Sequence, residues 1–228
     1  MEGYDKKNIP NVLDPAQLKR IEAVHGGFLY QHLYTVGCLL LAQSAGVDVV
    51  TVELDEDIEL ETNKTRIYVQ VKTRSKPIIP SDVSGALERF ENLRKKHAEG
   101  KRKGKPAFVF VANQPPSVSL QKTIDDNKIL PDVLFVWPKS SSKRGLALPP
   151  AWETLEDALA WCISQAEKLN FSLLSPDSLV WKLAGMAQFA ATGSPLNKQH
   201  AFQSNDLPAL FEQLIVQLQD FPSPPAFL

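Results

Sequence analysis

The sequence has little of what marks a secreted or disulfide-stabilised protein. Among its 228 residues there are two cysteines, Cys38 and Cys162, and both lie in apolar stretches without a partner at metal-ligand spacing. This excludes a disulfide scaffold and a cysteine-based zinc site, and it fits a reducing cytoplasm. The first 15 residues contain no apolar core and therefore do not form a signal peptide. We expect a cytoplasmic protein.

Long apolar runs are also scarce. A stretch of 25 residues between Glu22 and Asp48 carries no Asp, Glu, Lys or Arg, but histidine, glycine and glutamine residues interrupt it. Its strongly apolar part extends only from Leu33 to Ala42. Such a short segment suits a helix buried in a protein core better than one that crosses a bilayer. No membrane partner is expected.

What the sequence does contain is a globular composition with strongly segregated charge. Hydrophobic residues make up 43% and charged residues 22%, which excludes a chain that is disordered throughout. The net charge is −1, yet residues 48–61 carry seven acids and no base, and residues 64–105 carry thirteen bases and four acids. Such a pair of segments suits a metal-dependent enzyme with a polyphosphate substrate, and a solvated charged surface explains it equally well.

The order of expected helices and strands indicates an α/β fold over about residues 12–170. Asp14-Pro15 predicts a helix start, and Gly26-Gly27 is expected to break or bend that helix before a long apolar helix over 28–44. Strands are expected over 47–53, 57–61 and 66–72, with a hairpin turn over 62–65. Further along, the pattern predicts a helix from Ser81 or Asp82 to 98, strands over 107–112 and 133–137, and a helix over 154–169.

The residues after about position 170 form a second region. Helices are expected over 176–191 and 207–218, and three of the last eight residues are prolines, a composition typical of linkers. We therefore divide the chain into a domain over 1–170 and a helical extension with a linker over 171–228. The tail leads us to expect that a further module follows it in the native protein.

The residues that point to chemistry lie on the expected hairpin. Alternate side chains of a strand share a face, so Gln70 and Lys72 project together while Val71 turns into the core. Asp57, at the start of the partner strand, would approach that face. Carboxylate and amide oxygens suit Mg²⁺ or Mn²⁺, and a neighbouring lysine would position or deprotonate a water or hold phosphate oxygens. In a simpler interpretation Gln70 and Lys72 lie on a solvated face and Asp57 pairs with Lys72.

This arrangement resembles the PD-(D/E)xK, or restriction-endonuclease-like, nucleases. Asp57 matches the acid of that family, and Gln70-Val71-Lys72 matches its tripeptide in the glutamine variant. The resemblance implies a core of a helix, three antiparallel strands, a helix and further strands, followed here by C-terminal helices. It also implies that the backbone carbonyl of Val71 ligates metal.

Two further features extend the resemblance. These features are the segment Gly27-Phe-Leu-Tyr-Gln31 and the residue Glu53. They look like parts of the N-terminal DNA endonuclease domain of CD-NTase-associated and related antiphage effectors, and more distantly of Mrr-type restriction enzymes. The resemblance covers roughly residues 15–170. In that resemblance Gln31 stands where many relatives place a helix-borne acid that helps to hold metal, and Glu53 is an outer ligand. Gln70 in place of a carboxylate lowers the charge of the site and predicts a weaker metal affinity.

The resemblance implies an endonuclease that depends on Mg²⁺ or Mn²⁺, cleaves double-stranded DNA and serves bacterial antiphage defence. The expected catalytic residues are Asp57, Gln70, Lys72 and Glu53. The expected metal ligands are Asp57, Gln70, Val71 and Gln31. A C-terminal sensor or ATPase module is implied as a partner, and so is a homodimer or larger oligomer whose opposing active sites cut both strands. Two alternatives remain open: an inactive nuclease fold used for nucleic-acid binding or oligomerisation, and a nuclease acting on RNA or single strands.

A basic run follows the helix expected to end at residue 98. Its charges are expected to contact the DNA backbone, because each phosphate contact releases counterions. The candidate nucleic-acid residues are Lys95, Lys96, Lys101, Arg102 and Lys103. A solvated helix end and loop is the alternative interpretation.

Overall fold

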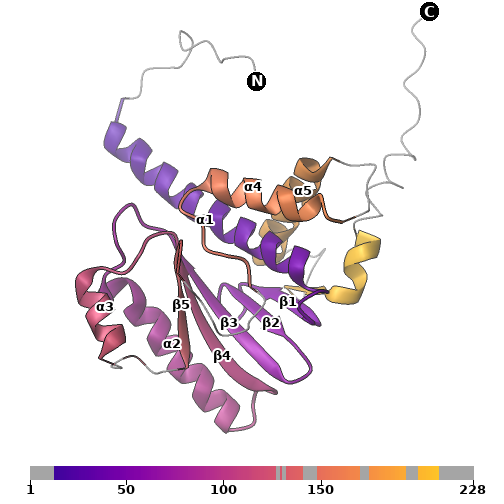
Figure 1. Cartoon of the computed structure of the whole chain (residues 1–228), viewed down its shortest axis with the longest axis horizontal. Helices are drawn as coiled ribbons and strands as arrows, with labels where there is room; N and C mark the ends of the chain where they lie inside the picture. The colour runs from indigo at the N-terminus through magenta and orange to yellow at the C-terminus, as the bar shows by residue number, and fades with distance from the viewer. Residues whose placement is uncertain are drawn as a thin grey trace, which may run out of the picture.

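The computed structural model describes residues 13–126, 129, 132–140, 148–169, 175–193 and 200–210. These residues form an α/β fold around a six-stranded mixed sheet with the order β5-β4-β3-β2-β1-β6 (Figure 1). The strands are β1 (Val49–Val52), β2 (Ile58–Glu61), β3 (Thr65–Lys72), β4 (Lys105–Ala112), β5 (Val133–Val136) and β6 (Ala201–Gln203).

The sheet changes from antiparallel to parallel pairing at β3. Strands β1, β2 and β3 pair antiparallel, with Ile58 opposite Val69, so the antiparallel pairing of the three expected strands is confirmed. Strand β3 then pairs in parallel with β4 along its whole length, which places Lys72 opposite Ala112. Parallel neighbours need a crossover connection, and the helix between β3 and β4 provides it.

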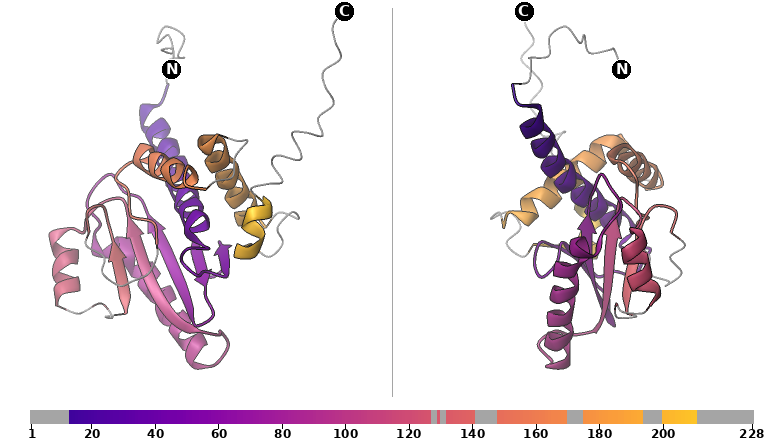
Figure 2. Two further views of the ribbon diagram at one scale, coloured as in Figure 1. Left: turned by 45° about the vertical axis from the view of Figure 1, so that its right-hand side comes forward. Right: turned by 90° about the vertical axis from the view of Figure 1, so that its left-hand side faces the viewer.

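Helices cover both faces of the sheet (Figures 1 and 2). Helices α1 (Pro15–Leu41), α4 (Leu155–Ala166) and α5 (Pro176–Ala191) lie on one face, whereas α2 (Pro80–Ala98) and the short α3 (Val118–Asp125) lie on the other. The side chains of β3 alternate between the two cores: Val69 and Val71 pack under α1, and Tyr68 packs under α2. This two-residue period places Gln70 and Lys72 on the face that α2 covers.

Helix α1 continues through Gly26-Gly27, so the expected break is wrong. It is a single helix of 27 residues, capped as expected by Asp14, which accepts hydrogen bonds from the backbone N–H groups of Ala16 and Gln17 at 3.0 and 2.9 Å. Each glycine costs about 1 kcal/mol of helix propensity. Most of the segment from Tyr30 to Leu40 is buried against the sheet and the other helices, and that burial outweighs the cost.

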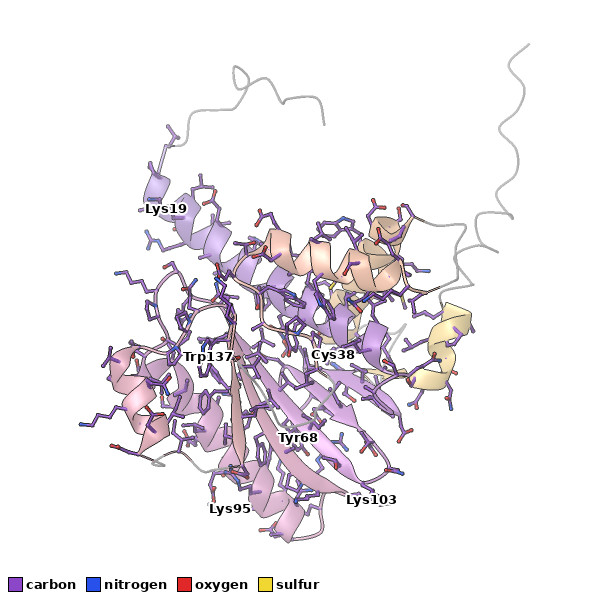
Figure 3. The ribbon with its side chains drawn as sticks, viewed as in Figure 1. Lys19, Cys38, Tyr68, Lys95, Lys103 and Trp137 are labelled. Atoms are coloured by element: carbon purple, nitrogen blue, oxygen red, sulfur yellow. The ribbon has the colours of Figure 1, made fainter. Side chains whose placement is uncertain are left out.

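The same burial accounts for the uncharged stretch of the sequence. Cys38, labelled in Figure 3, lies in the core between the helices and the sheet, with 3% of its surface exposed. Of the helices that the structure describes, none has the length and apolar character needed to cross a membrane.

Some element boundaries differ from those expected. Helix α2 begins at Pro80, earlier than expected, and the carboxylate of Asp82 accepts a hydrogen bond from the backbone N–H of Ile79 at 3.1 Å. The sequence did not predict α3 or β6, because α3 buries only Leu120 and β6 is three residues long and depends on pairing with β1. Of the helix expected over 207–218, residues 207–210 are helical and the rest lies outside the described residues.

Residues on either side of position 170 share one core. Helix α5 packs against α1 and α4, and β6 adds an edge to the sheet beside β1. Leu179 and Leu183 of α5 belong to the same buried cluster as Val50 of β1. The described part of the expected helical extension is therefore built onto the sheet.

Candidate active site

The candidate site lies at the carboxyl end of β3, beside the loop that joins β1 to β2. The expected alternation is confirmed: Val71 is buried, and Gln70 and Lys72 are half-buried on the opposite face. One carboxylate oxygen of Asp57, Oδ2, accepts hydrogen bonds from the backbone N–H of Val71 at 2.7 Å and from the Gln70 carboxamide. The hairpin thus brings Asp57 to the Gln-Val-Lys tripeptide.

The Gln70 carboxamide lies at a polar junction. Its Nε2 donates to Asp57 and, at 3.2 Å, to the backbone carbonyl oxygen of Val71, while its Oε1 accepts from the Arg89 guanidinium. The Asp57 carboxylate and the Val71 carbonyl therefore both accept hydrogen bonds from the Gln70 Nε2 group, and both are oxygen ligands of the kind that bind hard cations. A half-turn of the carboxamide would turn its own oxygen toward a cation in that position and would break its contact with Arg89.

Asp57 is in an unfavourable environment for a charged carboxylate. Burial raises its pKa to about 7, while the hydrogen bond from the Val71 N–H acts in the opposite direction. The nearby carboxylates of Glu53 and Glu56 raise the pKa further, and the positive charge of Arg89 lowers it. A buried carboxylate beside two others is stabilised in its charged form by any cation that binds among them.

Glu53 connects this loop to helix α1. Its backbone has a φ of 50°, in the left-handed region that residues other than glycine rarely adopt. The conformation is held by a 3.1 Å hydrogen bond from its N–H to the Asp57 carbonyl, and its carboxylate accepts a hydrogen bond from the Gln31 side chain. The structure thus brings Gln31 and Glu53 together next to Asp57. Such backbone strain is concentrated at functional sites in proteins.

Lys72 has an uncommitted side chain. Within the part of the chain that the structure describes, its ammonium group forms no ion pair or hydrogen bond. The simpler interpretation, in which Asp57 pairs with Lys72, is not what the structure shows, because the hydrogen bonds of Asp57 go to Val71 and Gln70. The amine is therefore available to a ligand.

An ion pair that the sequence analysis missed forms one wall of the site. The Arg89 guanidinium donates to both carboxylate oxygens of Glu56, at 2.8 and 3.2 Å. The Glu56 side chain is 0% exposed and the Arg89 side chain 48% exposed. Burial raises the pKa of Glu56, and the hydrogen bonds and charge of Arg89 oppose that shift. The available signal was helical spacing, because Asp82, Gly85 and Arg89 recur on one face of α2.

These residues line a cleft of about 500 Å³, which we call the acidic cleft. Its walls are the loop 53–57, Gln70 and Lys72 of β3, and the face of α2 that carries Asp82 and Arg89. Five of the lining side chains are acidic and two are basic. Asp55 is paired with Lys96 and Arg102, and Asp82 with Arg74, so Glu53 and Asp57 are the lining carboxylates without an ion pair among the described residues. These two carboxylates favour a cation.

The donors in this cleft fit Mg²⁺ better than a metal that needs several protein ligands. Among the described residues, no group of three or more His, Cys, Asp or Glu side chains is placed to hold a metal ion. A cation at Asp57 would depend on that carboxylate, the Val71 carbonyl and the Gln70 amide, with Glu53 and Gln31 further out. Mg²⁺ is commonly bound through one or two carboxylates and keeps several waters.

Lys95 and Lys103 of the basic run lie toward the end of the parallel strands opposite Lys72. Lys95 and Lys103 are labelled in Figure 3 near the C-terminal end of α2, whereas Trp137 follows β5 at the opposite end of the parallel strands. Because β3, β4 and β5 are parallel, Lys72 lies at the Trp137 end. The fold therefore does not bring Lys95 and Lys103 to the catalytic candidates.

The other three candidate nucleic-acid residues are paired with acids. Lys96 and Arg102 both contact the carboxylate of Asp55, Lys96 at 3.3 Å, and Lys101 contacts Glu99 at 2.7 Å. The acidic and basic segments of the sequence thus neutralise each other in part, through contacts between the loop 53–57 and α2 with the loop that follows it.

Comparison with known proteins gives structural likeness alone. No protein-family model and no curated protein sequence matches the chain. It is similar to an Acinetobacter baumannii Cap4 SAVED/CARF-domain containing receptor, both with the cyclic trinucleotide 2'3'3'-cAAA and in a second structure, with a TM-score of 0.54 and 13% identity in each case. These matches cover 84% of this chain and 46% and 48% of the receptor chains. A Moraxella osloensis Cap4 receptor matches with a TM-score of 0.48 and 12% identity, over 87% of this chain and 50% of that one.

The chain therefore spans about half the length of the receptors that it matches. At 13% identity the likeness shows the fold and carries no residue roles. The α/β fold described above is thus one that also occurs in Cap4 receptors.

Proposed function

We propose that this chain is an endonuclease that depends on a divalent cation, cleaves double-stranded DNA and acts in bacterial antiphage defence. One observation carries the proposal: Asp57, Gln70 and the Val71 carbonyl converge at the end of the β2–β3 hairpin, with Lys72, whose amine has no partner among the described residues, on the same face as Gln70. This arrangement supports the resemblance to the PD-(D/E)xK nucleases.

The role of each residue follows from its position. A Mg²⁺ or Mn²⁺ ion held in the acidic cleft would supply Lewis-acid stabilisation of the charge that develops on the scissile phosphate. Asp57 and the Val71 carbonyl would hold such an ion directly, and Gln70 would do so after its carboxamide turns. Lys72 would orient or deprotonate the attacking water, or contact the phosphate oxygens.

The role in defence rests on the resemblance and on the structural neighbours together. The neighbours are described as receptors that contain a SAVED/CARF domain, and this chain has a fold found in about half of such a protein. We assign the chain to the effector part of a longer protein whose sensor or ATPase module lies C-terminal to it. A homodimer or larger oligomer would place two active sites on the two strands of a duplex.

A second candidate function is favoured by the same neighbours. The Acinetobacter receptor was solved with two different cyclic trinucleotides. The second candidate function is therefore that this chain is a ligand-binding part of a sensor. In that function the chain would bind a nucleotide ligand or support oligomerisation, and the acidic cleft would be catalytically inactive. The two functions differ in their response to chelator.

Cleavage of supercoiled plasmid tests the proposal. In Mg²⁺ the purified chain is expected to produce nicked and linear DNA, and EDTA should abolish this activity. Lys72→Met removes only the amine and should slow cleavage about 100-fold or more. Lys95→Met removes the same group at the far end of α2 and is the matched control, expected to retain cleavage at saturating DNA.

The remaining outcomes separate the alternatives. Cleavage that survives Lys72→Met would place the chemistry elsewhere and contradict the proposed site. Faster cleavage of RNA or single-stranded DNA in parallel reactions would replace the duplex as substrate. Absence of cleavage together with calorimetric binding of a cyclic trinucleotide would favour the second function.

A further inference from the structure

A second cleft meets the acidic cleft at Lys72. It has a volume of about 690 Å³ and lies between the N-terminal half of α1 and the loop that follows β3. Lys72 and its neighbour Val71 are part of its lining. We call it the apolar cleft, because α1 presents Ala23, Val24 and Phe28 to it. The proposed chemistry leaves this cleft without a role.

The wall formed by α1 is apolar and accessible. Val24 is 56% exposed and Phe28 52% exposed, although both are large hydrophobic residues. They lie in the N-terminal half of α1, whereas most of the C-terminal half is buried. Gly27 lies between them on the cleft side, and a Cβ there would come within 3.1 Å of the Thr73 hydroxyl on the opposite wall. The glycine therefore lets α1 approach the loop after β3 closely, and the Phe28 ring is exposed at the edge of the cleft.

The opposite wall is basic and held firmly in place. The Asn113 side chain accepts a hydrogen bond from the Arg74 backbone N–H at 2.7 Å and donates one to the Arg74 carbonyl at 3.0 Å. The Arg74 guanidinium bonds to Asp82 at 2.7 Å and remains 44% exposed. Lys72 and Arg74 therefore line one cleft with two cationic groups, two residues apart along the chain.

Positive charge continues along α1 beyond the cleft. Lys19, labelled in Figure 3 at the outer end of α1, and Arg20 are exposed one helical turn before Ala23 and Val24. A cationic wall, an exposed aromatic ring and a basic approach are the features by which proteins hold a polynucleotide strand without reading its sequence.

We infer that the apolar cleft binds the nucleic-acid strand next to the scissile phosphate, with Phe28 against a base and with Lys72 and Arg74 on adjacent phosphates. The inference rests on the proposed nuclease function. An occupant of both clefts must pass Lys72, and a polynucleotide offers a phosphate to that amine and a flat apolar base to the ring. A phenylalanine can also insert between the base pairs of a duplex, so the contact does not require a single strand.

The test measures the affinity of the chain for DNA in EDTA, where cleavage is suppressed. The probe is a fluorescein-labelled duplex of about 20 base pairs, with the labelled single strand in parallel, and fluorescence anisotropy is the readout. Phe28→Ala is expected to weaken binding about tenfold, the effect of losing one base contact. Phe28→Trp is expected to keep the affinity, and DNA should quench its added fluorescence.

A matched control comes from another exposed phenylalanine. Phe189 lies on α5, is 58% exposed and lines neither cleft, so Phe189→Ala should leave the affinity for DNA unchanged. Thermal unfolding of each variant checks that it is folded, which is expected because Phe28 and Phe189 are both half-exposed.

Plasmid cleavage by the same variants distinguishes this inference from the proposed function. Binding that is equal in wild type and Phe28→Ala, with cleavage present, overturns the inference and leaves the nuclease. Binding that depends on Phe28 without any cleavage supports the cleft and overturns the nuclease. A change in sedimentation rather than in DNA affinity would make the cleft an interface between copies of the chain, and absence of DNA binding by the wild type would also overturn the inference.

Discussion

The acidic cleft and the apolar cleft share Lys72 but differ in every other respect. Among the described residues, five carboxylates line the first and one, that of Glu153, lines the second. The acidic cleft is maintained by ion pairs and hydrogen bonds between the loop 53–57, β3 and α2. The apolar cleft is maintained by the packing of α1 and by the docking of the β3–α2 loop on Asn113. The reacting part of a site needs charges held out of water, and the binding part needs an accessible surface.

Because of this difference, changes of charge and of pH should alter the stability of the acidic cleft. Changes of side-chain volume should alter the packing of the wall of the apolar cleft. Three measurements test this difference between the two clefts.

The largest effect is expected in the pH dependence of stability. The pKa of Asp57 is about 7 in the folded protein against an ordinary value of 3.8. The folded state therefore binds this proton more tightly than the unfolded state, and the resulting stability is present below about pH 4 and lost as the pH rises through about 7. Between pH 5 and pH 8 in EDTA, the free energy of unfolding of the wild type should fall by about 2 kcal/mol more than that of Asp57→Asn.

Urea unfolding at the two pH values measures this difference. Phe28→Ala, which changes the apolar cleft and removes no charge, is the control and should show the pH dependence of the wild type. Equal pH dependence in the wild type and Asp57→Asn would mean that Asp57 titrates as an ordinary carboxylate, and the contrast between the clefts would be weaker than the structure indicates.

An effect of comparable size is expected from alanine substitution at one of two glycines of α1. A Cβ at Gly37 would lie 2.7 Å from Cγ of Pro149 and 3.1 Å from the Trp161 ring, so Gly37→Ala should destabilise the fold by about 2 kcal/mol. At Gly27 the neighbour is the Thr73 hydroxyl, which can rotate away, and alanine gains up to about 1 kcal/mol of helix propensity. Thermal unfolding should therefore rank Gly27→Ala at or above the wild type. Equal losses would show that the wall of the apolar cleft is packed as tightly as the core.

The smallest effect is expected from the two arginines. Arg89→Ala leaves the buried Glu56 carboxylate without its ion-pair partner and should cost about 1 kcal/mol, less than a fully buried pair because Arg89 is 48% exposed. Arg74→Ala should cost less, since Asp82 keeps its hydrogen bond from the Ile79 N–H. Urea unfolding at pH 7 compares the two variants. A larger loss from Arg74→Ala would make the Arg74–Asp82 pair the more important of the two contacts.

Local patterns were sufficient to predict the hairpin and the faces on which its side chains lie. Strand alternation acts over a few residues, so the sequence alone placed Gln70 and Lys72 on one face and Val71 on the other. Helix capping is equally local, and Asp14 was recognised for that reason. The break at Gly26-Gly27 was predicted wrongly, because helix propensity is weak and the burial that outweighs it involves residues distant in the sequence.

Contacts between distant segments account for what the sequence analysis missed. The pairing of Glu56 with Arg89 joins residues 33 positions apart, and the contact of Asp55 with Arg102 joins residues 47 apart. Neither leaves a local pattern. The sequence therefore predicts a basic run that is free to contact DNA, whereas the fold pairs three of its five candidate residues with acids.

The sequence by itself determined the order of the main elements, the faces of the hairpin and the residue types that suit a hard cation, because each depends on neighbours within one turn or a few strand positions. Only the tertiary structure decided that Gln31, Glu53, Asp57 and Arg89 meet at one end of the sheet and that a second cleft opens beside Lys72. It also decided that Lys72 forms no ion pair or hydrogen bond with any of the described residues. Those features depend on how α1 and α2 pack against β3. That packing comes from apolar side chains across the whole chain, and no short segment of the sequence specifies it.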